Sequence, residues 1–417
     1  MTPDSPKGMR LHIGLFGRRN VGKSSLLNAL TRQEVSIVSP TAGTTTDPVE
    51  KAMELLPLGP VLFIDTAGVD DQGALGELRV QKTRRVFDRT DLGILVADAD
   101  AWGAFEEQIL AELEARKVPV VVAFNKVDQG RRPAPDRVAA LCARKVVAVQ
   151  TVASLRQGVG ELREALLLAA PEAFFDERRI LSDLVEPGEL AVLVVPLDKE
   201  APRGRLILPQ VQAIRDLLDG EAMALVVKES GLKEALGRQL RPPRLVVTDS
   251  QAFAEVAAAT PTGVPLTSFS ILMARFKGDL QALVEGTLAV DGLRPGDRVL
   301  VAEACTHHPI GEDIGRVKIP RWLAARVGGE LDFTHVQGRD FPDDLKGYRL
   351  VIHCGACTFN RRGMLSRVER ARRQGVPITN YGLVIAQSLG ILERALGPFP
   401  AALELFRGRR ERKAGER

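Results

Sequence analysis

Cysteine and aromatic residues are scarce in this chain, and no apolar run is long. The 417 residues include 4 Cys, 2 Trp and 2 Tyr, which excludes the disulfide framework of small secreted domains. Apolar stretches such as residues 118–124 are too short to span a bilayer, and the first ten residues lack the apolar core of a secretion signal. We therefore expect a cytoplasmic protein with no membrane partner.

An excess of charge of one sign is also nearly absent. The 57 basic and 53 acidic side chains leave a formal charge of +4, and much of that excess lies in residues 407–417. Proteins that bind nucleic acid usually carry a stronger basic bias, so we expect no nucleic-acid partner. We interpret the basic segment 407–417 as a solvated, disordered end.

Apolar runs alternate with amphipathic stretches along the whole chain, which predicts α/β domains with largely parallel sheets. A length of 417 residues suggests two to four domains. Breaks in the pattern predict one larger domain over residues 1–172 and two smaller α/β domains over 180–262 and 263–417. The predicted strands are residues 11–16, 61–65, 92–97, 118–125, 146–152, 191–197, 222–228, 245–248, 298–302, 331–336, 348–352 and 378–381.

Residues 17–24 fit the pattern GxxxxGK[ST] between a predicted strand and a predicted helix. In this context the glycines let backbone N–H groups face phosphates, Lys23 reaches the β and γ oxygens, and Ser24 binds magnesium. Two further motifs, Asp65-Thr-Ala-Gly and Asn125-Lys-x-Asp, each end a predicted strand. Ligands of open parallel sheets bind at that edge, so the first domain is predicted to be a P-loop nucleotide-binding domain.

These motifs resemble those of the GTPase superfamily, and the element 43–47 (GTTTD) looks like the switch I of Era and of the tRNA-modification GTPases. The resemblance implies GTP rather than ATP, because the Asp128 carboxylate would read guanine. It implies that Thr45 and Asp65 hold magnesium with Ser24, and that Gly68 senses the γ-phosphate. The GTP-binding residues are then Gly17, Asn20, Val21, Gly22, Lys23, Ser24, Ser25, Thr45, Asp65, Gly68, Asn125, Lys126, Asp128 and Ala153.

The same resemblance implies slow GTP hydrolysis. Val69 stands where other GTPases carry a glutamine that orients the attacking water. Glu77 lies near the position of a water-orienting glutamate in the tRNA-modification relatives, so the catalytic residues are expected to be Lys23, Thr45 and Glu77. Asn20 matches an asparagine that helps bind potassium in those relatives, although it could also be a tolerated loop residue.

Three of the four cysteines follow two predicted strands of the last domain, in the patterns Cys305-x-His307 and His353-Cys354-x-x-Cys357. Parallel strands bring both patterns to one sheet edge, and soft thiol ligands suit zinc or an iron-sulfur cluster. A zinc site would use three cysteines and His307. A 4Fe-4S cluster would use the three cysteines and leave the fourth iron to an exchangeable ligand, either His307 or His353. A CxxC redox pair would give Cys305 no role.

The remaining candidates are interpreted as structural. Cys142 lies alone in a helical segment and is expected in the core. His12 and His335 lie in or beside predicted strands.

The spacing CxH, 45 residues, HCxxC, combined with the GTPase motifs, resembles the FeFe-hydrogenase maturation GTPases (the HydF family) over essentially the whole chain. The resemblance implies a GTPase domain, a dimerisation domain and a 4Fe-4S domain. It implies a homodimeric scaffold that carries a transient 2Fe subcluster to apo FeFe-hydrogenase and works with radical-SAM maturases. A tRNA-modifying or ribosome-associated GTPase with a zinc module, and a redox-sensing GTPase, remain alternatives.

Overall fold

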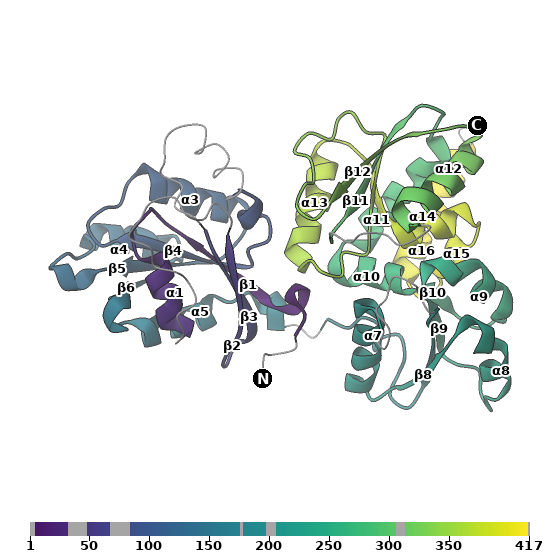
Figure 1. Cartoon of the computed structure of the whole chain (residues 1–417), viewed down its shortest axis with the longest axis horizontal. Helices are drawn as coiled ribbons and strands as arrows, with labels where there is room; N and C mark the ends of the chain where they lie inside the picture. Colours follow the sequence, from purple (N-terminus) through teal and green to yellow (C-terminus); the bar gives the residue numbers. More distant parts are fainter. Residues whose placement is uncertain are drawn as a thin grey trace. The chain divides into compact units, whose positions relative to one another are not determined.

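The computed structural model describes residues 5–31, 48–66, 84–175, 178–196, 206–305 and 313–415. The chain divides into two compact units, residues 1–177 and 178–417. The first unit contains one sheet and the second contains two (Figure 1). The α/β fold class predicted from the sequence is confirmed.

The first unit has a six-stranded sheet in the order β2-β3-β1-β4-β5-β6, in which only the β2–β3 pair is antiparallel. Apolar residues of α1 and α5 cover one face of this sheet, and those of α3 and α4 cover the other. The strands are β1 (Leu11–Phe16), β2 (Val49–Leu55), β3 (Gly59–Asp65), β4 (Leu92–Asp98), β5 (Val120–Asn125) and β6 (Val147–Thr151). The helices are α1 (Lys23–Thr31), α3 (Ala104–Ala115), α4 (Pro135–Ala143), α5 (Val159–Ala169) and α6 (Glu172–Phe175).

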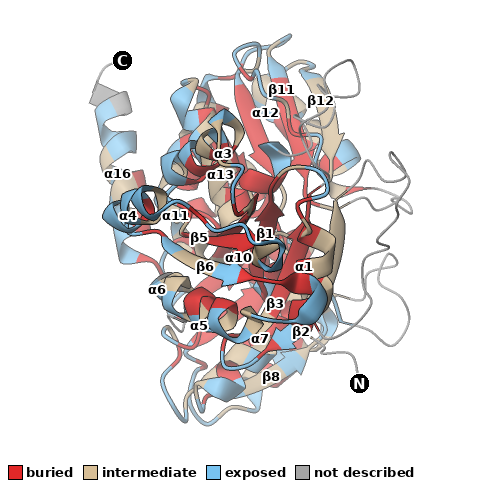
Figure 2. Cartoon of the chain, turned by 90° about the vertical axis from the view of Figure 1, so that its left-hand side faces the viewer, coloured by how far each residue is buried: buried red, intermediate tan, exposed pale blue. Residues whose placement is uncertain are grey.

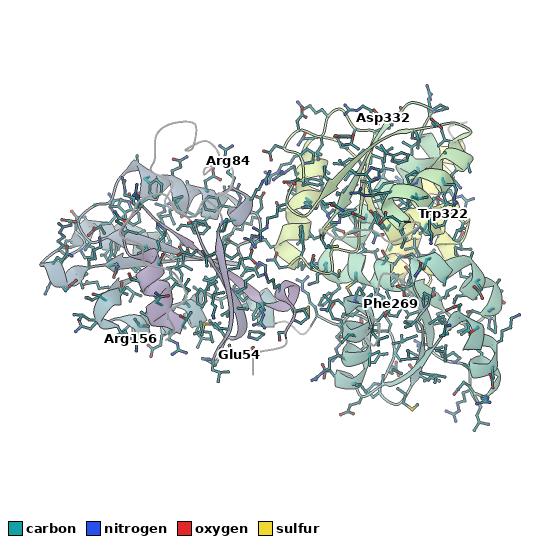
Figure 3. All side chains as sticks on the ribbon, in the orientation of Figure 1. Glu54, Arg84, Arg156, Phe269, Trp322 and Asp332 are labelled. Atoms are coloured by element: carbon teal, nitrogen blue, oxygen red, sulfur yellow. The ribbon has the colours of Figure 1, made fainter. Side chains whose placement is uncertain are left out.

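The second unit begins with a four-stranded parallel sheet in the order β10-β9-β7-β8. Phe269, labelled in Figure 3, begins the helix that follows β10 and is buried. The strands are β7 (Leu190–Val194), β8 (Met223–Val227), β9 (Leu245–Thr248) and β10 (Leu266–Ser268). The helices are α7 (Leu208–Asp219), α8 (Leu232–Gly237), α9 (Phe253–Ala259), α10 (Phe269–Lys277) and α11 (Leu280–Thr287).

A second parallel sheet, in the order β12-β11-β13-β14, completes this unit. One hydrophobic cluster runs from the first sheet of the unit into this one, and a smaller cluster lies between this sheet and α12 and α14. The strands are β11 (Arg298–Glu303), β12 (Asp332–Gln337), β13 (Leu350–His353) and β14 (Ile378–Asn380). The helices are α12 (Ile319–Val327), α13 (Arg361–Arg373), α14 (Tyr381–Ser388), α15 (Leu392–Ala395) and α16 (Pro400–Gly415).

Burial follows this layering. The central strands are mostly buried, whereas the helices carry their exposed residues on their outer faces (Figure 2). Among the described residues, no helix combines the length and the apolar composition that crossing a lipid bilayer requires.

Two sequence-based expectations about the elements were wrong or incomplete. Residues 407–415 of the segment expected to be disordered lie in α16, because Ala402 and Phe406 are buried and anchor that helix. Strands β2 and β10 were not predicted. Strand β2 is half exposed and antiparallel, and β10 has only three residues.

Candidate functional site

The loop between β1 and α1 needs glycine at two positions. Gly17 has a φ of +146°, and a Cβ atom there would lie 2.2 Å from the carbonyl oxygen of Val96. Gly22 has a φ of +98°, and its Cβ atom would lie 2.3 Å from Nδ2 of Asn125. Asn20 has a φ of 60°, which asparagine tolerates better than most residues. The close approach of the loop to β4 and β5 therefore explains both glycines.

The side chains of Lys23 and Ser24 both make hydrogen bonds at this edge of the sheet. The Nζ atom of Lys23 donates hydrogen bonds to the carbonyl oxygens of Gly17 (2.8 Å) and Arg18 (2.6 Å). The hydroxyl of Ser24 donates to Oδ2 of Asp65 at 2.8 Å, because β1 pairs in parallel with β3 and both strands end at the same edge. A hydroxyl beside a carboxylate at a helix N-terminus can hold magnesium against bound phosphates.

Asn125 connects the nucleotide loop to the end of β6. Its Nδ2 donates to the carbonyl oxygen of Val21 at 2.9 Å. Its Oδ1 accepts hydrogen bonds from the backbone N–H of Ala153 at 3.0 Å and from the hydroxyl of Thr151 at 3.2 Å. Thr151 was not singled out from the sequence, because no motif marks the last residue of β6. Asn125 therefore bridges β5, the loop after β1 and the segment that ends β6.

The other residues of the guanine motif stand at the surface. Asp128 lies in a short 3-10 turn (Val127–Gln129) and is exposed. Lys126 has a φ of 62°, and its Nζ lies 3.5 Å from Oδ2 of Asp98. An exposed carboxylate at this sheet edge is accessible to the N1–H and the exocyclic amine of guanine.

An ion pair that the motifs did not predict connects the loop between β1 and α1 with α3. The guanidinium of Arg18 forms a bidentate pair with Glu106 of α3, with N–O distances of 2.7 and 2.9 Å. Glu106 is completely buried and also accepts the backbone N–H of Gly103. The Gly-x-x-Glu capping pattern at the start of α3 was the available signal.

Some predicted residues of the nucleotide site cannot be placed. Thr45, Gly68, Val69 and Glu77 lie outside the described residues. Of the rest of the predicted set, Val21 is buried and Ser25 lies in the first turn of α1.

The three cysteines of the second unit lie at one edge of its second sheet. Cys305 follows β11, and Cys354 and Cys357 follow β13. The two strands are parallel neighbours, with Ala302 opposite His353. The predicted convergence of the two cysteine-bearing segments therefore matches the strand order, whereas His307 lies outside the described residues.

Both the backbone N–H and the sulfur of Cys354 form hydrogen bonds with backbone groups. Its N–H donates to the carbonyl oxygen of Ala302 at 2.9 Å. Its Sγ accepts the N–H groups of Ala304 at 3.1 Å and of Ala356 at 3.4 Å. Such bonds favour a thiolate at this sulfur.

Burial is the main electrostatic influence on these thiols, and it raises the pKa of Cys305, Cys354 and Cys357 to about 11. Nearby Cys357 further raises the pKa of Cys305, and Cys354 raises that of Cys357. Lys277 and Arg367 act in the opposite direction on the pKa of Cys357 and Cys354, respectively. A metal centre would displace the thiol protons as it binds.

The donor chemistry of this edge fits a soft metal centre, because three thiols at one sheet edge suit zinc or an iron-sulfur cluster. Within the described ranges, no three His, Cys, Asp or Glu side chains are already gathered tightly enough to hold a metal ion. His353 is fully buried, and both of its ring nitrogens contact other groups: Cys354 O at 2.8 Å and Arg367 at 2.7 Å.

A buried acidic network, not identified from the sequence, lies beside Cys305. Glu303 is 4% exposed and accepts hydrogen bonds from the hydroxyl of Tyr381 (3.1 Å) and from Nε2 of Gln337 (3.0 Å). Burial and the Glu303 carboxylate raise the pKa of Tyr381 well above its usual value. A Cβ atom on Gly315 would lie 2.1 Å from the Tyr381 hydroxyl. A carboxylate at the end of an apolar strand was the signal for this network.

The residues interpreted as structural have mixed outcomes. Cys142, expected in the core, is exposed, because Leu141 takes the buried position of α4. His12 is buried, and its Nε2 contacts the carbonyl oxygen of Lys7 at 3.0 Å. The half-buried His335 contacts the carbonyl oxygen of Gly315 at 3.2 Å.

Three family models match successive parts of the chain. Residues 12–126 match a model described as 50S ribosome-binding GTPase. Residues 180–278 match the hydrogen maturase F dimerization domain, and residues 281–398 match the hydrogen maturase F tetramerization domain. The first unit is therefore a GTPase domain, and the second consists of domains whose models are named for self-association.

Curated relatives match the GTPase part. GTPase Der of Wolinella succinogenes is 38% identical over 122 residues, which is 28% of this chain and 26% of that protein. The tRNA modification GTPase MnmE of Picosynechococcus sp. is 35% identical over 163 residues, which is 37% of this chain and 34% of that protein. This chain therefore matches only about a quarter to a third of the length of these relatives.

Solved structures of GTPases also match part of the chain. The G domain of the T. maritima FeoB iron transporter is 25% identical with a TM-score of 0.31, and the match covers 38% of this chain and 98% of that one. A variant of Aquifex aeolicus Era bound to GDP·AlF4− is 21% identical with a TM-score of 0.34, and the match covers 52% of this chain and 93% of that one.

Proposed function

Because the chain belongs to the hydrogen maturase F (HydF) family, we propose that it is a GTPase scaffold or carrier for the 2Fe subcluster of FeFe-hydrogenase. In this proposal it assembles or delivers that subcluster to apo-hydrogenase and carries a 4Fe-4S cluster on Cys305, Cys354 and Cys357. The observation that supports this most directly is the pairing of β11 with β13, since both cysteine-bearing segments leave the sheet at one edge. The iron of the 4Fe-4S cluster that has no cysteine ligand would anchor the 2Fe subcluster.

The nucleotide site is proposed to bind GTP with magnesium and to hydrolyse it slowly. Lys23 would bind the β and γ phosphates, and Ser24 and Asp65, already 2.8 Å apart, would hold the metal ion together with Thr45. Asn20 is exposed and its backbone has a left-handed conformation. Its side chain would help to bind potassium.

The segments would divide these tasks. Residues 1–172 would bind GTP, residues 180–262 would mediate a homodimer, and residues 263–417 would hold the cluster. The partners that the proposal requires are the radical-SAM maturases and apo FeFe-hydrogenase.

The test is anaerobic purification and reconstitution of the full chain and of its Cys305→Ser, Cys354→Ser and Cys357→Ser variants. Iron, labile sulfide and activation of apo-hydrogenase are measured for each. Each variant is expected to lose the cluster and the activation. Cys142→Ser is the matched control, because Cys142 is exposed and lies in the GTPase unit. A Cys305 variant with full iron content and full activation would refute the three-cysteine assignment.

A tRNA-modification or ribosome-associated GTPase with a Cys3His zinc module is the second candidate, and similarity to MnmE over the GTPase part favours it. The same preparation distinguishes the two candidates. Zinc without labile sulfide, together with copurifying RNA, would support this alternative. A redox-sensing GTPase would instead contain the cluster and show GTP hydrolysis that changes with its oxidation state, without activating apo-hydrogenase.

A further inference from the structure

Arg367 is a buried cation beneath the cysteine edge. It lies in the middle of α13 and is 7% exposed. Its guanidinium lies over two aromatic rings, 4.8 Å from the centre of Phe341 and 4.5 Å from that of Phe359. Burying a guanidinium costs free energy unless its N–H groups donate hydrogen bonds. The acceptors of Arg367 therefore indicate what this residue does.

One acceptor is His353, the last residue of β13. The Nη1 atom of Arg367 lies 2.7 Å from Nε2 of His353. Arginine stays protonated and offers only donors, so Nε2 must accept this hydrogen bond. The proton of the neutral ring is then on Nδ1, which donates to the carbonyl oxygen of Cys354 at 2.8 Å. The contacts therefore fix the tautomer and the orientation of the ring.

A second acceptor, among the described residues, leads to the other cysteine-bearing segment. Arg367 also donates to the carbonyl oxygen of Gly338, in the turn after β12. The preceding residue, Gln337, donates to Glu303 at the end of β11. Cys305 follows Glu303 by two residues. Arg367 of α13 is thus connected with the ends of β11 and β13, the two strands that the cysteines follow.

We propose that Arg367 is a positioning residue that acts through His353 to hold the Cys354–Cys357 loop in the shape its thiols need. This inference rests on the proposed cluster site and deepens it. It also assigns His353 as part of the support rather than as the exchangeable ligand, because each ring nitrogen already has a partner. Residues that support metal ligands in this way typically change metal affinity by about 10- to 100-fold when they are altered.

The experiment uses the full chain with Arg367→Met, Arg367→Lys, His353→Phe and His353→Gln. Methionine keeps an apolar stem near the two rings but removes the donors. Lysine keeps the charge but not the planar fork. Glutamine keeps an acceptor for Arg367, whereas phenylalanine keeps only the ring. Arg370→Met is the matched control on the same helix, because Arg370 pairs with Asp343 instead.

Three quantities are measured after anaerobic reconstitution: iron content, the rate of iron loss to a chelator, and the EPR spectrum of the reduced cluster. Arg367→Met and His353→Phe are expected to release iron about 10- to 100-fold faster. His353→Gln should recover part of the loss, and the double variant should be no worse than the poorer single variant. Thermal unfolding of the metal-free proteins separates lost positioning from lost folding. A variant that does not fold is replaced in the comparison by its conservative partner, Arg367→Lys or His353→Gln.

The outcomes separate this inference from the proposed function. If Cys354→Ser loses the cluster while folded Arg367 and His353 variants keep native iron release and EPR spectra, the positioning role is wrong and the cluster site stands. If the reduced cluster shows strong hyperfine coupling to a histidine nitrogen that disappears in His353→Gln, His353 is a ligand and the inference fails. If Cys354→Ser keeps the cluster, the proposed site itself fails.

Discussion

Replacement of Asn125 by alanine should destabilise the GTPase unit before any nucleotide is added. The amide of Asn125 is the partner of the Val21 carbonyl oxygen and of the Ala153 N–H, and both hydrogen bonds are buried. A buried polar group that loses its partner costs about 1–3 kcal/mol. The two backbone groups alone predict a loss of roughly 2–6 kcal/mol in the free energy of unfolding. The Thr151 hydroxyl, which also donates to Asn125, loses its acceptor as well and adds to this loss.

Thr151→Val is the matched control. It removes only the hydroxyl that donates to Asn125 at 3.2 Å and keeps the shape of the side chain. This variant loses one hydrogen bond but leaves no buried group without a partner, because Oδ1 of Asn125 still accepts the N–H of Ala153. The free energy of unfolding should therefore fall by about 0.5–1.5 kcal/mol. The contrast between the two variants isolates the cost of the groups that lose Asn125 as a partner, which are the two backbone groups and the Thr151 hydroxyl.

The assay must report on the first unit alone, since a chain with two units need not unfold in one step. The sequence contains two tryptophans, Trp102 in the first unit and Trp322 in the second. In a Trp322→Phe background, urea unfolding followed by Trp102 fluorescence therefore reports on the GTPase unit. An Asn125→Ala variant that costs no more than Thr151→Val would refute the reasoning.

Two further predictions concern the nucleotide site and self-association. GTP hydrolysis should be faster in potassium than in sodium and abolished by Lys23→Ala, and equal steady-state rates in the two salts would overturn the role given to Asn20. The edge strand β8 exposes Val226 at 42%, and open apolar edges favour pairing with a second copy. Val226→Lys should therefore halve the mass seen by light scattering, whereas Leu240→Lys, at a fully exposed position outside the strands, should leave it unchanged.

The backbone of the nucleotide loop could be predicted from its motif, because the motif places glycine where the loop needs positive φ values and close approaches. Gly17 and Gly22 are required by contacts with β4 and β5, and the same glycines make the pattern recognisable in the sequence. The hydrogen bond from Asn125 to Val21 could not be predicted, since it joins β5 to the loop after β1, 104 residues away in the chain.

The sequence-based predictions were wrong where a shift of one residue changes which side of a helix a side chain occupies. In α4 successive residues differ by about 100° around the axis, so Leu141 is buried while Cys142 is exposed. In the C-terminal segment the basic composition suggested disorder, but Phe406 packs into the core and Arg409 pairs with Glu285 of α11. Composition averages over a segment, whereas packing depends on single positions.

The same distinction explains why the role of α13 was not apparent from its sequence. Its thirteen residues, RRGMLSRVERARR, read as a basic, solvated helix. Its buried positions nevertheless recur every three or four residues, at Gly363, Met364, Arg367, Val368 and Ala371. An arginine on the apolar stripe of a helix needs buried acceptors, and the sheet edge offers the Nε2 atom of His353. Helical phase, rather than charge content, therefore marks Arg367 as an arginine of this segment that reaches the cysteine edge.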